Sequence, residues 1–195
     1  MISSVQTSWA ALLGNPNSGK TAIFNLLTGL NHKVSNYPGV TVEKKTGLAR
    51  FAAGDQFNIL DLPGTYSLTP ESMDERIVTE QVLNWIHGHE PPDVIISVVD
   101  ATNLSRNLYL TSQLADLGIP IVVALNMMDM VKQDLNINYE KLANDLDVAA
   151  IIPMSATEKW GQSELLESIK KSMNSNVVEN PFPIFLNDDI SNALK

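Results

Sequence analysis

The stretch GNPNSGKT, residues 14–21, places two glycines, a lysine and a hydroxyl at the spacing G-x-x-x-x-G-K-[ST]. At this spacing Gly14 and Gly19 let the backbone turn tightly, so that its N–H groups face a phosphate. Lys20 would then reach the β- and γ-phosphates of a nucleotide, and the hydroxyl of Thr21 would bind Mg²⁺. The alternative is an ordinary turn, since turns also favour Gly, Asn and Pro. Because an apolar run precedes the stretch and an amphipathic run follows it, we interpret it as a phosphate loop.

Two further stretches carry groups that suit a magnesium-bound triphosphate. In NILDLPGTY, Asp61 ends an apolar run, where its carboxylate can hold a metal-bound water, and the N–H of Gly64 can contact a γ-phosphate. In PGVTVE, the hydroxyl of Thr41 can complete the Mg²⁺ shell when the γ-phosphate is present. Taken alone, DLPG is more typical of an ordinary turn, and Thr41 is more typical of a surface threonine. The prediction therefore depends on their occurring together with the phosphate loop.

Two later stretches carry groups that suit a guanine base. In ALNMMD, Asp129 can accept two hydrogen bonds from the N1 and N2 donors of guanine, an arrangement that adenine lacks. Asn126 can tie this loop to the phosphate loop or contact the base. In PMSATEK, the small residues Ser155 and Ala156 would let backbone N–H groups approach the guanine oxygen. The alternatives are an Asx-rich turn for the first stretch and a helix N-cap for the second.

These groups need a scaffold that brings distant parts of the chain to one edge. Short apolar runs such as VIISVV and IVVAL are typical of strands buried on both faces, and they alternate with amphipathic runs. The alternation predicts an α/β fold with a mainly parallel, six-stranded sheet flanked by helices, and the phosphate loop makes it a P-loop NTPase fold. We expect residues 30–46 to form a long functional loop. The predicted strands are 9–13, 47–52, 57–61, 94–99, 121–125 and 149–154, and the predicted helices are 20–28, 72–87, 106–117, 139–146 and 163–172.

Composition limits the classes of protein that fit. The chain has 195 residues, of which 44% are apolar and 18% charged, so one folded domain is expected. The formal net charge of −9 argues against a nucleic-acid-binding surface. There is no cysteine, which excludes disulfides and thiolate metal sites. The longest apolar runs are too short to span a bilayer, so we expect the chain to be soluble.

In this order, the stretches GNPNSGKT, NYPGVTVE, DLPGTYSL, NMMD and SAT resemble the N-terminal G domain of FeoB, the bacterial ferrous iron transport protein B. The resemblance covers roughly residues 9–173. It implies a Ras-like domain that binds and hydrolyses GTP and then holds GDP. In that family the domain lies on the cytoplasmic face of the bacterial inner membrane, followed by a helical domain and a polytopic membrane domain. Those two domains and guanine nucleotide are the implied partners, nucleic acid is not, and an oligomer is possible.

Motifs and resemblance together define the expected site. Lys20, Thr41, Gly64 and Asn17 are the expected catalytic residues, and Thr21 and Thr41, with Asp61 through a water, are the expected Mg²⁺ ligands. The residues expected to bind the nucleotide and its ions are Gly14, Asn15, Asn17, Ser18, Gly19, Lys20, Thr21, Ala22, Thr41, Asp61, Gly64, Asn126, Met127, Asp129, Ser155, Ala156 and Thr157.

The sequence departs from many GTPases at two positions. Met127 stands where many carry a lysine whose stem covers the base, which Met127 can do without the charge. Thr65 follows DLPG, where Ras-like proteins have the glutamine that orients the attacking water, and threonine is too short for that geometry. For Asn17, the resemblance implies that its side chain helps to bind K⁺ beside the β- and γ-phosphates. The alternative is that Asn17 only caps the phosphate loop.

The expected organisation is a GTPase domain over residues 1–174, followed at 175–195 by a linker and the truncated start of a helical domain. Two other functions stay open. One is a free-standing ribosome-assembly or translation GTPase, although this acidic chain carries no basic RNA-binding domain. The other is a guanine-nucleotide switch with negligible turnover, which Thr65 keeps open.

Overall fold

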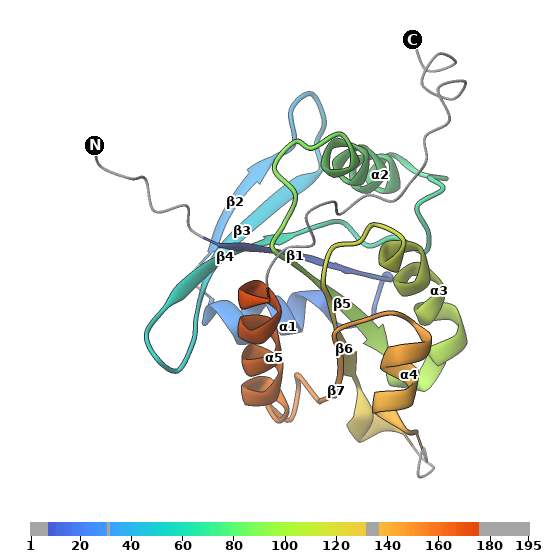
Figure 1. Ribbon diagram of the computed structural model, residues 1–195. Coiled ribbons are helices and arrows are strands. Elements are labelled where there is room, and N and C mark those ends of the chain that lie inside the picture. The colour runs from blue at the N-terminus through green and yellow to red at the C-terminus, as the bar shows by residue number, and fades with distance from the viewer. Residues whose placement is uncertain (1–7, 31, 132–136, 176–195) are drawn as a thin grey trace.

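The computed structural model describes residues 8–30, 32–131 and 137–175. It shows one twisted sheet of seven strands in the order β2-β3-β4-β1-β5-β6-β7, with helices on both faces (Figure 1). The strands are β1 (Trp9–Gly14), β2 (His32–Asn36), β3 (Glu43–Arg50), β4 (Gln56–Asp61), β5 (Val94–Asp100), β6 (Ile121–Asn126) and β7 (Ala150–Pro153). The α-helices are α1 (Lys20–Thr28), α2 (Met73–Ile86), α3 (Leu104–Ala115), α4 (Tyr139–Asp145) and α5 (Gln162–Asn174).

Apolar burial explains the layered arrangement. The strands β1, β5 and β6 are buried almost throughout, as their uninterrupted apolar runs predict. On one face they pack against α2, α3 and α4, where Trp85 and Leu110 lie in the core. On the other face they pack against α1 and α5 through side chains such as Phe24 and Leu165.

Strand direction places the site at one edge of the sheet. The strand β1 pairs in parallel with β4 and β5, and parallel pairing continues through β6 to β7. The carboxyl ends of these strands therefore meet at a common edge, where open α/β sheets bind ligands. Gly14, Asp61 and Asn126 are the last residues of β1, β4 and β6. The predicted α/β class with a mainly parallel sheet is confirmed.

The prediction of six strands and of a loop over residues 30–46 was wrong. This part of the chain, of which Asn31 lies outside the described residues, contains β2, a turn, and the first half of β3. The turn is closed by the N–H of Tyr37, which donates to the carbonyl oxygen of Val42 at 3.0 Å. All five residues of β2, with the sequence HKVSN, are exposed at the edge of the sheet, so no apolar alternation marks the strand.

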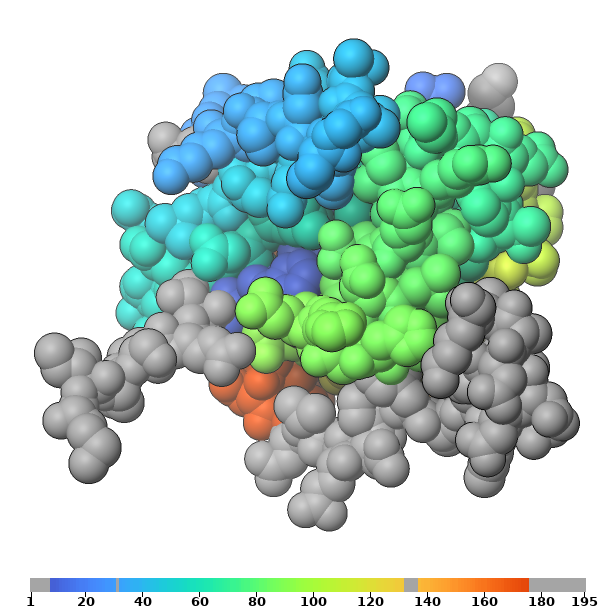
Figure 2. All heavy atoms as spheres, turned by 90° about the horizontal axis from the view of Figure 1, so that it is seen from above, coloured from blue at the N-terminus to red at the C-terminus, as the bar shows by residue number. Residues whose placement is uncertain are grey.

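Helix coverage is uneven across the sheet. Seen from above, the atoms of β2 and β3 lie beside those of α2 and are not covered by them (Figure 2). Leu48 of β3 and Asn58 of β4 are accordingly exposed on that face. The antiparallel strands β2 and β3 thus extend the sheet beyond the central strands, which helices cover on both faces. The expected linker and helical segment, residues 175–195, lies outside the described residues except for Ser175.

Candidate nucleotide-binding site

The phosphate loop joins β1 to α1 in a conformation that presents backbone N–H groups. Asn17 and Gly19 have positive φ angles of 64° and 90°. The hydroxyl of Ser18 donates to the carbonyl oxygen of Asn15 at 2.8 Å, which holds the loop closed from inside. At the start of α1, Gly19 supplies no side-chain cap. The first N–H groups of α1 therefore receive no hydrogen bond from a capping side chain, and helix N-termini of this kind bind anions.

Asn126 connects three of the predicted loops. Its side chain is buried; Nδ2 donates to the carbonyl oxygen of Ser18 at 3.0 Å, and Oδ1 accepts from the N–H of Ala156 at 3.0 Å. A Cβ atom at Gly19 would collide with Nδ2 of Asn126, so this approach requires glycine. Of the two roles considered for Asn126, the structure shows the tie to the phosphate loop.

In the loop with the sequence SAT, the backbone N–H groups expected to approach guanine are bonded within the protein. The N–H of Ala156 is bonded to Asn126, and the N–H of Ser155 donates to the carbonyl oxygen of Trp160 at 3.3 Å. The cause is local: Ser155 and Trp160 form an antiparallel bridge that closes the loop on itself. A guanine contact by Ala156 therefore requires its N–H to share or exchange this bond. Thr157, by contrast, is exposed at the loop surface.

The predicted base contacts from β6 lie just beyond its end. Met127 has a positive φ of 63° and precedes a short 3₁₀ turn, Met128–Met130, which carries Asp129. The N–H of Met128 donates to the carbonyl oxygen of Met154 at 3.3 Å, which ties this turn to the residue that follows β7. Asp129 is exposed, so its carboxylate faces solvent beside the Asn126 loop.

A hollow of about 420 Å³ collects the residues predicted for the terminal phosphate and Mg²⁺. It is lined by Lys20 and Thr21 of α1, by Thr41, by Asp61 at the end of β4 and by Gly64 in the segment after it. The lining also includes Val42, Glu43, Lys45, Leu62, Pro63 and Asp74. A Cβ atom at Gly64 would lie 3.0 Å from Cα of Pro16, so the segment after β4 packs directly on the phosphate loop.

The charges in this hollow are set by burial. Asp61 is 8% exposed, and its Oδ1 has no hydrogen-bond partner among the described residues. Burial raises the pKa of Asp61, and the charges of Lys20 and Lys45 act in the opposite direction. Burial likewise lowers the pKa of Lys20, opposed by Asp61. Tyr37 is also affected: burial, together with the charge of Asp61, raises its pKa to about 12.

The residues present fit a hydrated Mg²⁺ ion. Magnesium prefers oxygen ligands and keeps several of its waters. The hydroxyls of Thr21 and Thr41 are on exposed residues that line the same hollow as Asp61. The unpartnered, buried Oδ1 of Asp61 is an acceptor suited to a metal-bound water.

Thr65 faces into the protein. It is fully buried, and its hydroxyl donates to the carbonyl oxygen of Ser67 at 2.6 Å. Its N–H donates to the carbonyl oxygen of Gly14 at 3.2 Å, so the residue fixes this segment to the phosphate loop. Thr65 therefore has a structural role: its hydroxyl and its N–H are both bonded within the protein.

Sequence reasoning missed the residues that hold the segment after β4. The carboxylate of Glu75 accepts from the N–H of Glu71 at 2.8 Å and of Tyr66 at 3.4 Å. These bonds, with that of Glu71 the strongest, lower the pKa of Glu75. The ring of Tyr66 stacks on the guanidinium of Arg106 at 4.1 Å. The signal available was Ser72 followed three residues later by Glu75, which is a capping-box pattern.

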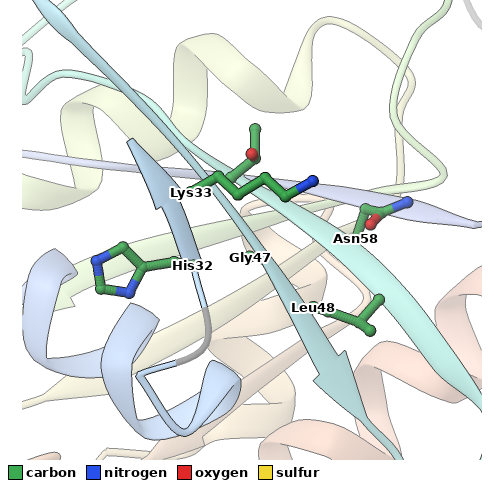
Figure 3. Close-up of a pocket in the computed structure, with 6 residues that line it drawn as sticks. His32, Lys33, Gly47, Leu48 and Asn58 are labelled. Atoms are coloured by element: carbon green, nitrogen blue, oxygen red, sulfur yellow. The ribbon is translucent and has the colours of Figure 1, made fainter. Parts of the chain in front are cut away.

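A second hollow, of about 480 Å³, lies on the outer strands and contains none of the predicted site residues. It is lined by His32, Lys33, Thr46, Gly47, Leu48 and Asn58 (Figure 3). His32 lies toward α1, where its ring meets Phe24 edge-on at 5.4 Å. The hollow is a product of the uncovered β2–β3 extension and is distinct from the nucleotide site.

Known proteins resemble the chain in sequence. The family model described as ferrous iron transport protein B matches residues 8–169. The Fe(2+) transporter FeoB of Salmonella typhimurium is 46% identical over 173 residues, which is 85% of this chain and 21% of that protein. The Fe(2+) transporter FeoB of Legionella pneumophila is 47% identical over 166 residues, or 82% of this chain and 21% of that protein. The chain thus spans about a fifth of the length of these relatives.

Solved structures agree with this likeness. A GDP-bound mutant of the S. thermophilus FeoB G domain has a TM-score of 0.78 at 41% identity, covering 96% of this chain and 69% of that chain. The cytosolic domain of T. maritima FeoB in its GMPPNP form has a TM-score of 0.78 at 34% identity, covering 88% and 66%. Among the described residues, no helix is both long and apolar enough to cross a bilayer. The predicted resemblance is confirmed: the chain belongs to the ferrous iron transport protein B family, as its G domain.

Proposed function

We propose that this chain binds GTP and hydrolyses it to GDP and phosphate as the regulatory domain of a ferrous iron transporter. The observation that carries the proposal is the pair of hydrogen bonds from Asn126 to Ser18 and Ala156, which joins the phosphate loop to both predicted base loops. The S. thermophilus and T. maritima domains bind GDP and GMPPNP. We extend guanine nucleotide binding to this chain because its loops carry the groups that recognise phosphate and guanine.

The residues of the hollow have distinct tasks in hydrolysis. Lys20 and the N–H groups of the phosphate loop bind the β- and γ-phosphates, while Thr41 and the N–H of Gly64 contact the γ-phosphate. Water attacks the γ-phosphorus in line, the bond to the β–γ bridging oxygen breaks, and GDP leaves with the electron pair of that bond. Thr21, Thr41 and Asp61 would hold Mg²⁺, which neutralises phosphate charge when bound. Since Thr65 is buried and bonded, positioning and charge neutralisation must carry the rate.

A monovalent cation at Asn17 would supply charge that no arginine provides. The three arginines of the chain, Arg50, Arg76 and Arg106, do not line the hollow, and Arg106 is stacked on Tyr66. Asn17 is exposed at the tip of the phosphate loop, and its amide oxygen is a suitable ligand for K⁺. We propose that K⁺ binds there, between the phosphates and carbonyl oxygens of residues 30–46, and stimulates hydrolysis.

The relatives' length supports a larger assembly. We propose that residues 1–174 are the GTPase domain and that 175–195 lead into a helical domain, with a membrane domain beyond it. The site would then lie on the cytoplasmic face of the membrane, where loss of the γ-phosphate relaxes residues 30–46 and 62–79 and regulates Fe²⁺ passage. The burial of Thr65 also favours a second candidate, a guanine-nucleotide switch with negligible turnover.

Phosphate release separates these candidates. The chain should release phosphate from GTP but not from ATP, and a Mg²⁺ chelator should abolish release. The rate should be higher in potassium chloride than in sodium chloride at equal ionic strength. Asn17→Ala should lose this difference while keeping its affinity for GDP. Equal rates in both salts would remove the potassium proposal, and no release under any condition would favour the switch without turnover.

A further inference from the structure

We propose that Lys45 is a second lysine for the γ-phosphate, which leaves Glu43 and binds the terminal phosphate when GTP replaces GDP. This inference rests on the proposed function, because it needs a guanine triphosphate in the hollow. Lys20 and Thr41 were singled out by their motifs, whereas Lys45 belongs to none of the motifs. Its position in the sheet brings it to the site.

The strand register places Lys45 next to Asp61. In the antiparallel pair of β3 and β4, Lys45 lies directly opposite Asp61. Side chains of directly opposed residues project from the same face of a sheet. Both residues line the 420 Å³ hollow, together with Thr41 and Gly64. Lys45 therefore enters the hollow from β3, and Lys20 enters it from α1.

The present partner of Lys45 is weakly held. Its Nζ lies 3.2 Å from a carboxylate oxygen of Glu43, and the two side chains are 29% and 59% exposed. Exposed ion pairs contribute little to stability, because water screens the charges and the side chains lose freedom. Exchange of Glu43 for a phosphate oxygen would therefore cost little.

The lining of the hollow shows that the two lysines share one volume, because Lys20, Lys45 and Asp61 all line it. Two ammonium groups directed at one hollow repel each other unless an anion lies between them. The carboxylates of Glu43 and Asp74 also line the hollow, and a bound triphosphate adds further negative charge. A second lysine offsets part of the repulsion between these carboxylates and the triphosphate, at the place where the γ-phosphate would bind.

Two neighbouring lysines, Lys44 and Lys33, do not line the nucleotide hollow. Lys44 precedes Lys45 on β3, so it points to the other face, and its Nζ lies 5.7 Å from the ring centre of Tyr37. Lys33 of β2 pairs with Thr46 and lines the separate outer hollow. Lys33 thus has the same charge on the same part of the sheet without access to the nucleotide hollow.

The test compares a fluorescent GDP with a fluorescent non-hydrolysable GTP analogue, both with Mg²⁺, in equilibrium titrations. A charge-assisted hydrogen bond of this kind corresponds to roughly a tenfold change in affinity. Lys45→Met should therefore weaken binding of the GTP analogue about tenfold and change GDP affinity less than about twofold. Lys45→Arg should retain most of the preference, and Lys33→Met should match the wild type.

The outcomes distinguish this inference from the proposed function. Equal changes for both nucleotides in Lys45→Met, or unchanged binding of the analogue, would overturn the role of Lys45 and leave the GTPase proposal intact. Failure of the wild type to bind either guanine nucleotide would overturn both. Glu43→Gln gives a second reading: freeing Lys45 should strengthen binding of the analogue relative to GDP, and a relative weakening would contradict the exchange.

Discussion

The base side of the site, Asn126 with Ser155 and Ala156, is buried and bonded internally, whereas the γ-phosphate side around Thr41 is exposed. The base side stands on β6 and β7 in the two-sided core. Thr41 lies in the turn between the edge strand β2 and β3, and it is exposed. Low burial permits local opening, so the two sides should respond differently to nucleotide. The first is preformed, and the second is suited to being ordered by the γ-phosphate.

Breaking the base side should have the largest effect. Asn126→Ala leaves the carbonyl oxygen of Ser18 and the N–H of Ala156 without their partner. Each buried orphan costs about 1–3 kcal/mol, so we expect a loss of roughly 4 kcal/mol in unfolding free energy. GDP and GTP-analogue affinity should fall equally, as measured by titration.

A matched control is Asn107→Ala. This buried asparagine also makes two hydrogen bonds, to the N–H of Asp100 at 3.3 Å and the carbonyl oxygen of Asn103 at 2.9 Å. It should lose stability while keeping nucleotide affinity near the wild-type value. If both variants lost affinity in proportion to stability, the special position of Asn126 would be refuted.

Base selectivity should show the next largest effect. Removal of one charged partner from a paired contact costs about 2–5 kcal/mol, so Asp129→Asn should weaken GDP binding by that amount. Xanthine nucleotides should bind this variant better than guanine nucleotides in competition assays. Asp116→Asn, an exposed change of the same charge, is the control. Unchanged guanine affinity in Asp129→Asn would remove the case for guanine recognition at this residue.

On the γ-phosphate side, the effect should depend on the nucleotide. Thr41→Ala should leave GDP affinity within about twofold and weaken the GTP analogue by roughly tenfold, as expected for one lost contact to a charged group. The rate of GTP hydrolysis by Thr41→Ala should also fall, as measured by a phosphate-release assay. Thr46→Ala, on β3 beside the outer hollow, should change neither quantity. Equal losses for GDP and the analogue would contradict the assignment of this turn as a switch.

The smallest expected effect is on the stability of the nucleotide-free chain. Because burial raises the pKa of Asp61, folding favours its protonated form, and that stabilisation is lost as the pH rises through the raised pKa. Asp61→Asn should therefore raise the unfolding free energy at neutral pH by roughly 1 kcal/mol, or about 2–4 °C in Tm. The gain should shrink as the pH is lowered. A gain of the same size in Asp116→Asn would contradict this explanation.

The sequence predicted the two sides of the site unequally. Buried parallel strands and the loops after them follow from apolar runs and motif spacing, so Gly14, Asp61 and Asn126 were correctly placed at strand ends. The strand β2 was missed because HKVSN is exposed and pairs at an edge, where backbone hydrogen bonds rather than apolar contacts hold it. Lys45 and Glu75 were missed because strand register and local bonds, rather than a motif, bring them to the site. The bond between Ala156 and Asn126 likewise depends on the path of a loop.

Hydrogen–deuterium exchange of the nucleotide-free, GDP-bound and GTP-analogue-bound chain tests the contrast between the two sides most directly. Backbone amides after β6 and β7 should gain protection with either nucleotide and to the same extent. Amides of residues 37–43 and 62–72 should gain protection with the analogue and Mg²⁺ but not with GDP. Equal protection of these segments by GDP and by the analogue, or a difference confined to the base side, would contradict the account.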